Sequence, residues 1–475
     1  MPVPHPHIAS KPSWSVTLWL IVVCALTVPA SAQTDYWERA NGPYGGTAVR
    51  DLEMSDDGWI YAATANGVFR SSDDGLTWEG FSDGLISIDI RDIHIREDGS
   101  IWAASYGAGL FKRSPRSSAW QFAALQNVFL STLIEPVPGL MIAGSNGFVY
   151  RSEDSGASWE AKTLEGFSVN VQDLSFNSEY YFAATSLGIF RSNDSGHTWE
   201  FASFGLQEYD VLTVETNAEG HVFAGSNPSG GGCAIYRSRG NGNIWTCIQP
   251  LTDPLIVPVL KVGPEGKLYA GGYRNLYNTD DEGSTWFTQS ATGSSVESLL
   301  FTETSLLVGT QGLGVYRSIN GGSTWESSNQ GIQSRINSVN SLDDGRLIVG
   351  TEGGLFQSTD LGLSWRRVDE VEPLVQQVTD VALDPDGNLV AATTAGLWRN
   401  LVNGGWEAMG PPGMPSIRDI FIAEDATILA GYHAGVYLFS GSFWIASPIN
   451  GADQAPRDVS AVLRTSAGTI MAGAA

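Results

Sequence analysis

The chain has 475 residues, with 51 Asp and Glu against 26 Lys and Arg, and a formal net charge of −25. Binding to phosphate groups needs a basic face that this composition does not supply, so it argues against nucleic acid and anionic membranes as partners. We interpret the acidity as a solubility feature, the alternative being an acidic site for a cation. Charged residues are spread along the chain, which indicates no charged disordered tail.

The first 32 residues are typical of an export signal. Lys11 is the only formally charged residue among them, residues 15–28 are apolar, and Ala30-Ser31-Ala32 offers a cleavage site of small residues. We expect the mature chain to begin near Gln33, to be secreted, periplasmic or at the cell surface, and to have no membrane insertion after signal removal. An uncleaved membrane anchor is the alternative.

From residue 48 onward the sequence repeats one pattern of short strands and turns. In its first copy we expect strands at 48–54, 59–63, 68–71 and 77–81, because apolar and β-branched runs alternate with Gly- and Asp-rich turn signals. The second strands contain small residues, as in Leu140-Met-Ile-Ala-Gly144, so neighbouring sheets are expected to approach closely. Four short strands per repeat predict an antiparallel blade.

The turn between the third and fourth strands carries a hydroxyl residue, an Asp, a Gly, a second hydroxyl residue and a Trp. Asp accepts backbone N–H bonds and Gly takes positive φ, so the motif predicts a tight turn, after which the Trp opens the fourth strand and buries its ring. One copy has Asn320 in place of Asp. The copies comprise Ser71, Asp73, Gly75, Trp78, Ser152, Asp154, Gly156, Trp159, Ser192, Asp194, Gly196, Trp199, Thr279, Asp281, Gly283, Trp286, Ser318, Asn320, Gly322, Trp325, Ser358, Asp360, Gly362 and Trp365.

This motif resembles the Asp-box (BNR) repeat of sialidase-like, sortilin-like and photosystem II assembly-factor-like β-propellers. The resemblance covers most of the chain through the repeat alone. It implies a propeller fold in which the boxes stand at the rims of blades, away from any active site.

The box-position tryptophans recur every 38 to 46 residues from Trp78 to Trp444, which is the period of a propeller blade. We therefore expect an all-β protein, a β-propeller of four-stranded antiparallel blades with ten full repeats of about 41 residues and partial blades at both ends. The copies that end at Trp120, Trp245, Trp406 and Trp444 lack the Asp.

Repeats of this length suit a ring of seven blades. The predicted organisation is a signal peptide at 1–32, a propeller ring at 33–330, and further blades at 331–475 as an incomplete second ring or a continuation of the same ring. The alternative is one ring of ten or eleven blades, as in sortilin-like relatives. Two last strands are expected at 459–464 and 469–473, which leaves a C-terminal truncation open.

Two cysteines follow the predicted signal, Cys233 and Cys247, and they flank a degenerate box in which Gly240 replaces Asp. If the strands on either side pair across this turn, the cysteines come nearly opposite each other, so we predict a disulfide. Two buried free thiols are the alternative.

The sequence shows no motif for catalysis, a cofactor or a metal. There is no Arg-Ile-Pro of the sialidases, no His-Glu-x-x-His and no Gly-x-Ser-x-Gly, so we expect no enzyme activity, no cofactor and no metal site. Glycoside hydrolase chemistry of the sialidase-like or xyloglucanase-like kind is the enzymatic alternative. It would need a pair of carboxylates, for which the candidates are the loop acids Asp210, Asp253, Glu370 and Glu372.

A ligand site is expected where the second-to-third-strand loops and the inter-blade loops converge. Most of these loops are small, and the exceptions are Tyr106, Tyr273, Arg274, Tyr432 and His433. An aromatic ring beside a hydrogen-bond donor suits a carbohydrate or protein ligand. We therefore expect a secreted, non-catalytic binding or scaffold module. The chain could instead be the sensor propeller of a truncated signalling receptor, or a chaperone like the photosystem assembly factors.

Overall fold

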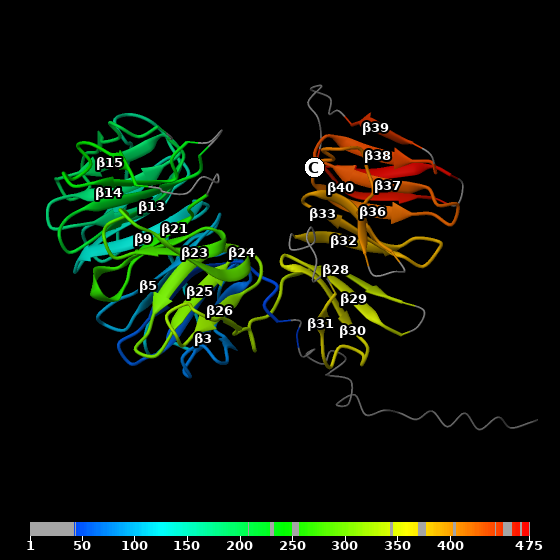
Figure 1. Ribbon diagram of the computed structural model, residues 1–475, viewed down its shortest axis with the longest axis horizontal. Coiled ribbons are helices and arrows are strands. Elements are labelled where there is room, and N and C mark those ends of the chain that lie inside the picture. Colours follow the sequence, from blue (N-terminus) through cyan, green and yellow to red (C-terminus); the bar gives the residue numbers. More distant parts are fainter. Residues whose placement is uncertain are drawn as a thin grey trace, which may run out of the picture. The chain divides into compact units, whose positions relative to one another are not determined.

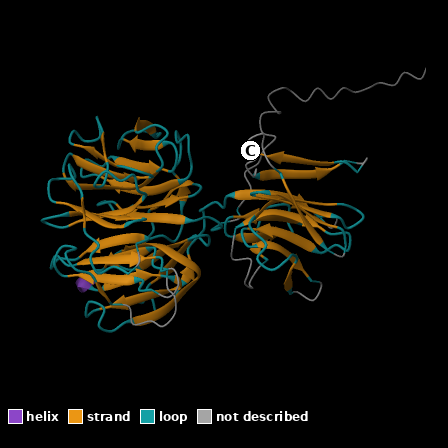
Figure 2. Ribbon diagram, turned by 90° about the horizontal axis from the view of Figure 1, so that it is seen from above, coloured by secondary structure: helices purple, strands orange, loops and turns teal. Residues whose placement is uncertain are grey.

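The computed structural model of the chain describes residues 42, 44–207, 209–228, 232–248, 256–342, 345–368, 377–401, 405–441, 443–449, 458–465 and 468–474. The predicted signal peptide at 1–32 lies outside these residues. The described part is all-β and carries one short 3₁₀ turn, Pro264–Gly266 (Figure 2). The predicted fold class is therefore confirmed.

Residues 49 to 327 form seven blades, which we number 1 to 7 in chain order (Figure 1). Each is an antiparallel meander in which strand order follows the sequence. Blades 1 to 3 comprise β1 (Val49–Met54), β2 (Ile60–Thr64), β3 (Gly67–Ser71), β4 (Glu79–Gly80), β5 (Ile90–Ile95), β6 (Ile101–Ser105), β7 (Gly109–Arg113), β8 (Gln121–Ala124), β9 (Leu130–Val137), β10 (Leu140–Ser145), β11 (Val149–Ser152) and β12 (Glu160–Lys162).

Blades 4 and 5 comprise β13 (Val171–Phe176), β14 (Tyr181–Thr185), β15 (Gly188–Ser192), β16 (Glu200–Phe201), β17 (Val211–Thr216), β18 (Val222–Ser226), β19 (Ile235–Ser238) and β20 (Thr246–Cys247). Blades 6 and 7 share the long strand β24 (Phe287–Phe301), which belongs to both sheets. Their other strands are β21 (Val259–Val262), β22 (Leu268–Gly271), β23 (Tyr273–Thr279), β25 (Leu306–Thr310), β26 (Val315–Ser318) and β27 (Glu326–Ser327).

The ring closes after the seventh blade, because β1 packs against β24 and β25. Ser298 Oγ donates to Val49 O at 3.3 Å, and the indole N–H of Trp78 donates to Ser328 O at 2.9 Å. The alternative of one ring of ten or eleven blades is therefore not adopted. The exact division of the chain at residue 330 stays a prediction.

Residues 336 to 474 form further blades of the same kind. Three four-stranded sheets and one two-stranded sheet follow one another, with each first strand packed on the next. Their strands are β28 (Ile336–Ser341), β29 (Leu347–Thr351), β30 (Gly354–Ser358), β31 (Arg366–Arg367), β32 (Val378–Leu383), β33 (Leu389–Thr393), β34 (Gly396–Asn400), β35 (Trp406–Ala408), β36 (Ile417–Ile422), β37 (Ile428–Tyr432), β38 (Gly435–Phe439), β39 (Trp444–Pro448), β40 (Val459–Arg464) and β41 (Ile470–Ala474).

Small residues of the second strands allow the blades to pack closely, as the sequence predicts. A Cβ added to Gly144 would lie 2.7 Å from the side chain of Val171 on the next blade. At the ring closure, a Cβ on Gly309 would lie 2.6 Å from Val49. A larger side chain at either position would force the two sheets apart.

The Asp-box turn has the predicted hydrogen bonds. In blade 4, Asp194 accepts from the backbone N of Thr198 at 2.9 Å and from the Thr198 hydroxyl at 2.6 Å. The N–H of Gly196 donates to Ser192 Oγ at 2.9 Å, and Gly196 has a φ of 80°. These bonds lower the pKa of Asp194 to about 2 against the opposing effect of burial.

In blade 1 the fourth strand starts later than expected, whereas β35 and β39 begin at Trp406 and Trp444 as predicted. The sequence predicts that Trp78 opens it, whereas β4 begins at Glu79. The reason is that the backbone N–H of Trp78 donates to Gln330 O, next to the end of blade 7, at 2.8 Å. Trp120 does the same to Asp83 O at 2.7 Å, so the box-position tryptophan links its blade to the preceding one.

The degenerate box of blade 5 keeps the first hydroxyl residue and the glycine of the motif, which are Ser238 and Gly242. Gly242 N donates to Ser238 Oγ at 3.0 Å, although no carboxylate is present at Gly240. Cys233 and Cys247 form a disulfide, with Cα atoms 6.0 Å apart. This hairpin is therefore held by a covalent link in place of the missing Asp bonds.

Candidate functional site

The first strands of the seven blades all begin at one end of the central channel. We call this end the mouth, and all seven blades contribute residues to it. The mouth contains a cavity of about 800 Å³. Its lining comes from the starts of the first strands and from the loops that follow the second strands, which is the face where the sequence predicts a ligand site. The charged and aromatic residues of the lining are Arg50, Arg91, Tyr106, Phe129, Tyr273 and Glu297.

Tyr106 stands at this mouth with 40% of its surface exposed. Its ring lies 4.9 Å from that of Phe129 in an edge-to-face arrangement. The guanidinium of Arg91 lies over the Tyr106 ring at 4.3 Å and donates to Asp89 at 2.8 Å. These contacts hold an exposed aromatic surface in one orientation, which favours ligand binding because little side-chain entropy remains to be lost.

Tyr273 lines the same cavity from blade 6 and is 56% exposed. Arg274 lies 5.0 Å from the Tyr273 ring centroid and has a φ of 66°, in the left-handed region that side chains other than Gly rarely adopt. Arg274 supports the tyrosine but does not itself line the cavity. The structure thus brings Tyr106 and Tyr273, predicted separately, to one mouth.

Tyr432 and His433 belong to the C-terminal blades and do not line this mouth. Tyr432 is 8% exposed, and its ring packs 4.6 Å from Tyr437 and 5.4 Å from His433. Burial raises the pKa of Tyr432. Tyr432 therefore packs within its own blade, whereas His433 is exposed.

The charged lining of the mouth includes an arginine and a glutamate that pair with each other. Arg50 and Glu297 form an ion pair at 3.7 Å, on the first strands of blades 1 and 7. Burial raises the pKa of Glu297, and Arg50 partly offsets this effect. Among the described lining residues Glu297 is the one carboxylate of this cavity.

Below the mouth, carboxylates of the first strands link successive blades. Asp92 accepts from Leu133 N at 2.5 Å, and Asp173 accepts from Val214 N at 3.0 Å. Burial raises the pKa of both aspartates, because charge is costly in the closely packed channel. This role was not predicted from the sequence, although a signal exists: Arg50-Asp-Leu, Arg91-Asp-Ile and Gln172-Asp-Leu recur at the blade period.

Lys261 stands within this acidic channel, and Arg50 and Arg91 line the same cavity. Burial alone would lower the pKa of Lys261, but Glu215, Asp51 and Asp173 outweigh it, so the pKa is raised. The cavity at this level is lined by the first strands of all seven blades. The channel carboxylates therefore accept hydrogen bonds from the backbone of the next blade, and some of them interact with the charge of Lys261.

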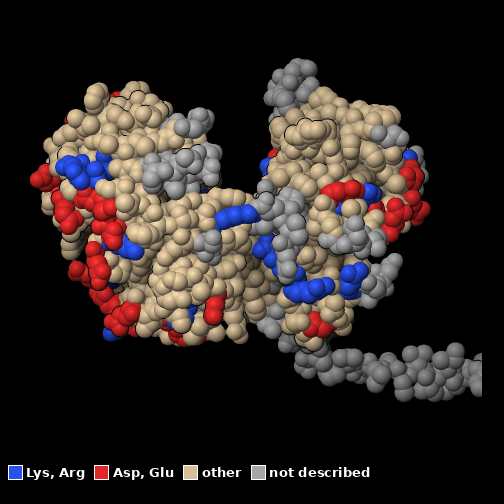
Figure 3. Space-filling model, in the orientation of Figure 1, with Lys and Arg blue, Asp and Glu red and all other residues tan. Residues whose placement is uncertain are grey.

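The surface of the ring is strongly acidic on one side. Figure 3 shows carboxylate side chains gathered along the left edge of the ring in this view. Among the described residues no three His, Cys, Asp or Glu side chains converge closely enough to hold a metal ion. Within the same part of the chain, no helix has the length and apolar character needed to cross a membrane.

Of the four loop acids named as candidates for a hydrolase, the structure describes Asp210. Asp210 accepts from the side-chain amide of Asn227 at 3.1 Å. The other candidates, Asp253, Glu370 and Glu372, lie outside the described residues.

No protein-family model and no curated protein matches the chain, whereas solved structures match its fold. An ancestral GH74 enzyme aligns at a TM-score of 0.59 and 16% identity, over 85% of this chain and 69% of that one. The GH74 xyloglucanase from Xanthomonas campestris aligns at 0.56 and 15% identity, over 91% of this chain and 86% of that one.

The extracellular domain of a putative one-component system from B. thetaiotaomicron aligns at a TM-score of 0.50 and 13% identity. That alignment covers 92% of this chain, which spans 64% of the length of that domain. Identities this low show a shared propeller fold and do not assign an activity.

Proposed function

We propose that this chain is an exported, non-catalytic β-propeller that binds a carbohydrate at the mouth of its seven-bladed ring. The observation that supports it is the pair of exposed tyrosines, Tyr106 and Tyr273, on the wall of one 800 Å³ cavity. Exposed aromatic rings offer flat apolar faces to sugar rings, while the amides of Asn146, Asn170 and Gln172 in the same lining supply hydrogen bonds.

The charge of the mouth supports binding in preference to hydrolysis. Glycoside hydrolysis uses two carboxyl groups on either side of the bond that is cleaved. The described lining supplies one, Glu297, which is already paired with Arg50. The same proposal includes export of the chain by a signal peptide at 1–32. It also includes a propeller ring at 33–330 and further blades at 331–475.

The test is binding of neutral oligosaccharides, including xyloglucan fragments, to the purified protein by isothermal titration calorimetry. Tyr106→Ala and Tyr273→Ala are each expected to weaken binding by about tenfold, the loss of roughly 1.4 kcal/mol. Phe204→Ala is the matched control, because Phe204 is 74% exposed on the ring but does not line the mouth.

Two results would overturn the proposal. Release of reducing sugar from xyloglucan by the purified protein would show that the chain is a hydrolase. Binding of peptides with no binding of any glycan would assign the mouth to a protein ligand.

A further inference from the structure

A second cavity of about 620 Å³ lies between blades 1 and 2, at the opposite end of the strands from the mouth. Strand β1 begins at the mouth with Arg50 and ends in this cavity with Met54. The walls come from the turn after β1, the turn after β5 and the turn between β7 and β8. We call it the inter-blade pocket.

At other interfaces of the ring this space is filled by the Asp-box turn of the following blade. A Cβ on the box glycine Gly156 would lie 2.4 Å from Trp102 of blade 2, and one on Gly75 would lie 2.4 Å from Leu307 of blade 7. A third-strand arginine also reaches across to the turn. Arg237 donates to Glu282 O at 2.7 Å, and Arg317 donates to Asp74 O at 2.9 Å.

Blade 2 has lost this turn. When Trp120 is aligned with Trp78, Arg113 occupies the position of the box hydroxyl residue Ser71. In the same alignment Pro115 replaces the box Asp, and Ser117 replaces the box Gly. The third-strand arginine of blade 1, Arg70, therefore has no box turn to reach. It pairs with Glu79 on its own blade, with Nε and Oε1 2.6 Å apart.

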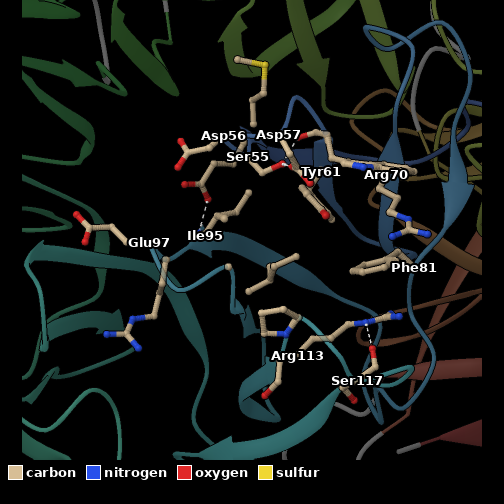
Figure 4. A pocket seen from close by; sticks show the side chains of 18 residues that line it. Ser55, Asp56, Asp57, Tyr61, Arg70, Phe81, Ile95, Glu97, Arg113 and Ser117 are labelled. Carbon is tan, nitrogen blue, oxygen red and sulfur yellow. Dashed lines mark hydrogen bonds between the residues drawn. The ribbon is translucent and has the colours of Figure 1, made fainter.

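Two of the three arginines that line the pocket, Arg70 and Arg113, are stacked on aromatic rings. The guanidinium of Arg70 lies 4.3 Å from the ring centroids of both Trp59 and Phe81. That of Arg113 lies 3.6 Å from the Phe81 centroid, and Figure 4 shows Phe81 between the two guanidinium groups. Stacking of this kind holds the planar groups in place and leaves their N–H edges available.

Arg113 forms no ion pair within 4.0 Å among the described residues, and its Nε donates to Ser117 O at 3.2 Å. Burial and the neighbouring charge of Arg70 lower the pKa of Arg113, and the charge of Asp83 opposes them in part. A cation held beside another cation in a partly closed pocket is stabilised by any anion that reaches it.

The remaining walls restrict what that anion can be. Ile95, Ile101 and Pro115 provide apolar surface. Four carboxyl side chains line the same pocket, Glu53, Asp56, Asp57 and Glu97. Asp56 and Glu97 stand across it from Arg70 and Arg113 (Figure 4). These repel a doubly charged phosphate more strongly than a singly charged group.

We propose that the inter-blade pocket binds a small organic carboxylate, whose charged end pairs with the Arg113 guanidinium and whose apolar body packs on Ile95, Ile101 and Pro115. A guanidinium edge matches a carboxylate with two parallel hydrogen bonds, which a single-point cation does not provide. The site is independent of the mouth, since the two cavities share no lining residue.

The test compares benzoate with its neutral isostere benzamide, titrated into the purified protein by calorimetry. Benzoate is expected to bind at least about tenfold more tightly, because benzamide has no charge to pair with Arg113. A second pair, glucuronate and glucose, is titrated in the same way. Tighter binding of glucuronate than of benzoate would identify the ligand as a sugar acid, and the reverse would identify a simpler organic acid. Equal binding of benzoate and benzamide, no binding of either acid, or tighter binding of inorganic phosphate would overturn the proposal.

Variants locate the site. Arg113→Gln is expected to weaken binding of the preferred acid by about tenfold or more, and Arg113→Lys to retain part of it. Arg116→Gln is the matched control, because Arg116 is exposed in the same turn but does not line the pocket. If Arg113→Gln does not fold, Arg113→Ser, which restores the usual box residue, replaces it. Unchanged binding in a folded Arg113 variant would contradict the assignment.

Discussion

Blades 2 and 5 have both lost the Asp of the box, and the two losses have different structural results. In blade 5, Ser238 and Gly242 keep their hydrogen bond, and a disulfide joins Cys233 to Cys247. In blade 2 neither the hydroxyl nor the glycine is kept, and a cavity with a charged arginine opens at the interface. Blade 5 thus keeps the contact of its box glycine with blade 4, and the cavity beside that box, lined by Gly242 and Asn243, is the smaller of the two at about 420 Å³.

The comparison indicates which part of the box matters for packing. The Asp bonds lie within the turn, whereas the glycine touches the neighbouring blade. Loss of the Asp alone therefore weakens one hairpin, while loss of the glycine changes the contact between two blades.

The largest expected loss of stability on substitution concerns the disulfide of blade 5. Replacing both Cys233 and Cys247 with Ser should lower the free energy of unfolding by about 3 kcal/mol, because the bond constrains the unfolded chain over a separation of 14 residues. Urea denaturation of the variant and of the oxidised protein measures the difference, with the reduced wild-type protein as control. A variant as stable as the oxidised protein would show that hairpin pairing alone holds blade 5.

The next effect concerns two glutamates at matching positions on first strands. Glu53, at the wall of the inter-blade pocket, accepts from Ile95 N at 3.1 Å, and Glu215 accepts from Val262 N at 3.0 Å. Burial and the charge of Asp51 raise the pKa of Glu53 to about 8. Burial raises the pKa of Glu215 to about 7, against the opposing charge of Lys261.

Raised carboxyl pKa values set the sign of the pH dependence. From about pH 4.5 to pH 8 the unfolded chain loses the Glu53 proton first, so stability falls as pH rises, by at most about 1.4 kcal/mol per pH unit. Glu53→Gln should match the wild type at pH 4.5 and be more stable at pH 8. Glu215→Gln should gain less, since Lys261 loses its partner. Denaturation curves of both variants across this range measure the effect, and wild-type stability that rises toward pH 8 would contradict it.

The smallest effect concerns an intact box. Asp194→Ala in blade 4 should cost about 1 kcal/mol at pH 7, because the hydrogen bonds to Thr198 N and Oγ1 are lost. The pKa of Asp194 is lowered to about 2, so its contribution is present above about pH 4 and is lost as pH falls through 2. Thermal unfolding at pH 7 provides the measurement, and Asp57→Ala, exposed in another turn, is the control. Equal losses in the two variants would show that the box carboxylate has no special role.

Local patterns made much of the fold predictable from the sequence. The spacing of the tryptophans and the positive φ of the box glycines both depend on short-range geometry. The structure has the predicted blade repeat and places the box glycines at positive φ. The beginning of the fourth strand at Glu79 was missed, because the backbone of Trp78 bonds to the connector after blade 7. The indole N–H of Trp78 likewise donates to Ser328 O, 250 residues away along the chain.

The candidate site was predictable only in part. Exposed aromatics in otherwise small loops indicated Tyr106 and Tyr273, which the ring brings together. The same signal indicated Tyr432, whose ring packs on Tyr437 within its own blade. A loop residue's pattern does not reveal whether its side chain faces a cavity or a neighbouring strand.

The sequence by itself determined the blade, because each turn and strand depends on residues within one repeat of about 41 residues. The tertiary structure alone decided that the ring closes between β1 and β24, and where cavities open. Ring closure and the cavities depend on contacts between blades. Those contacts depend on whether a side chain of one repeat fills the space beside a side chain of another repeat. Arg113 shows this most clearly, since its place in the repeat is visible in the sequence, but the empty space beside it is not.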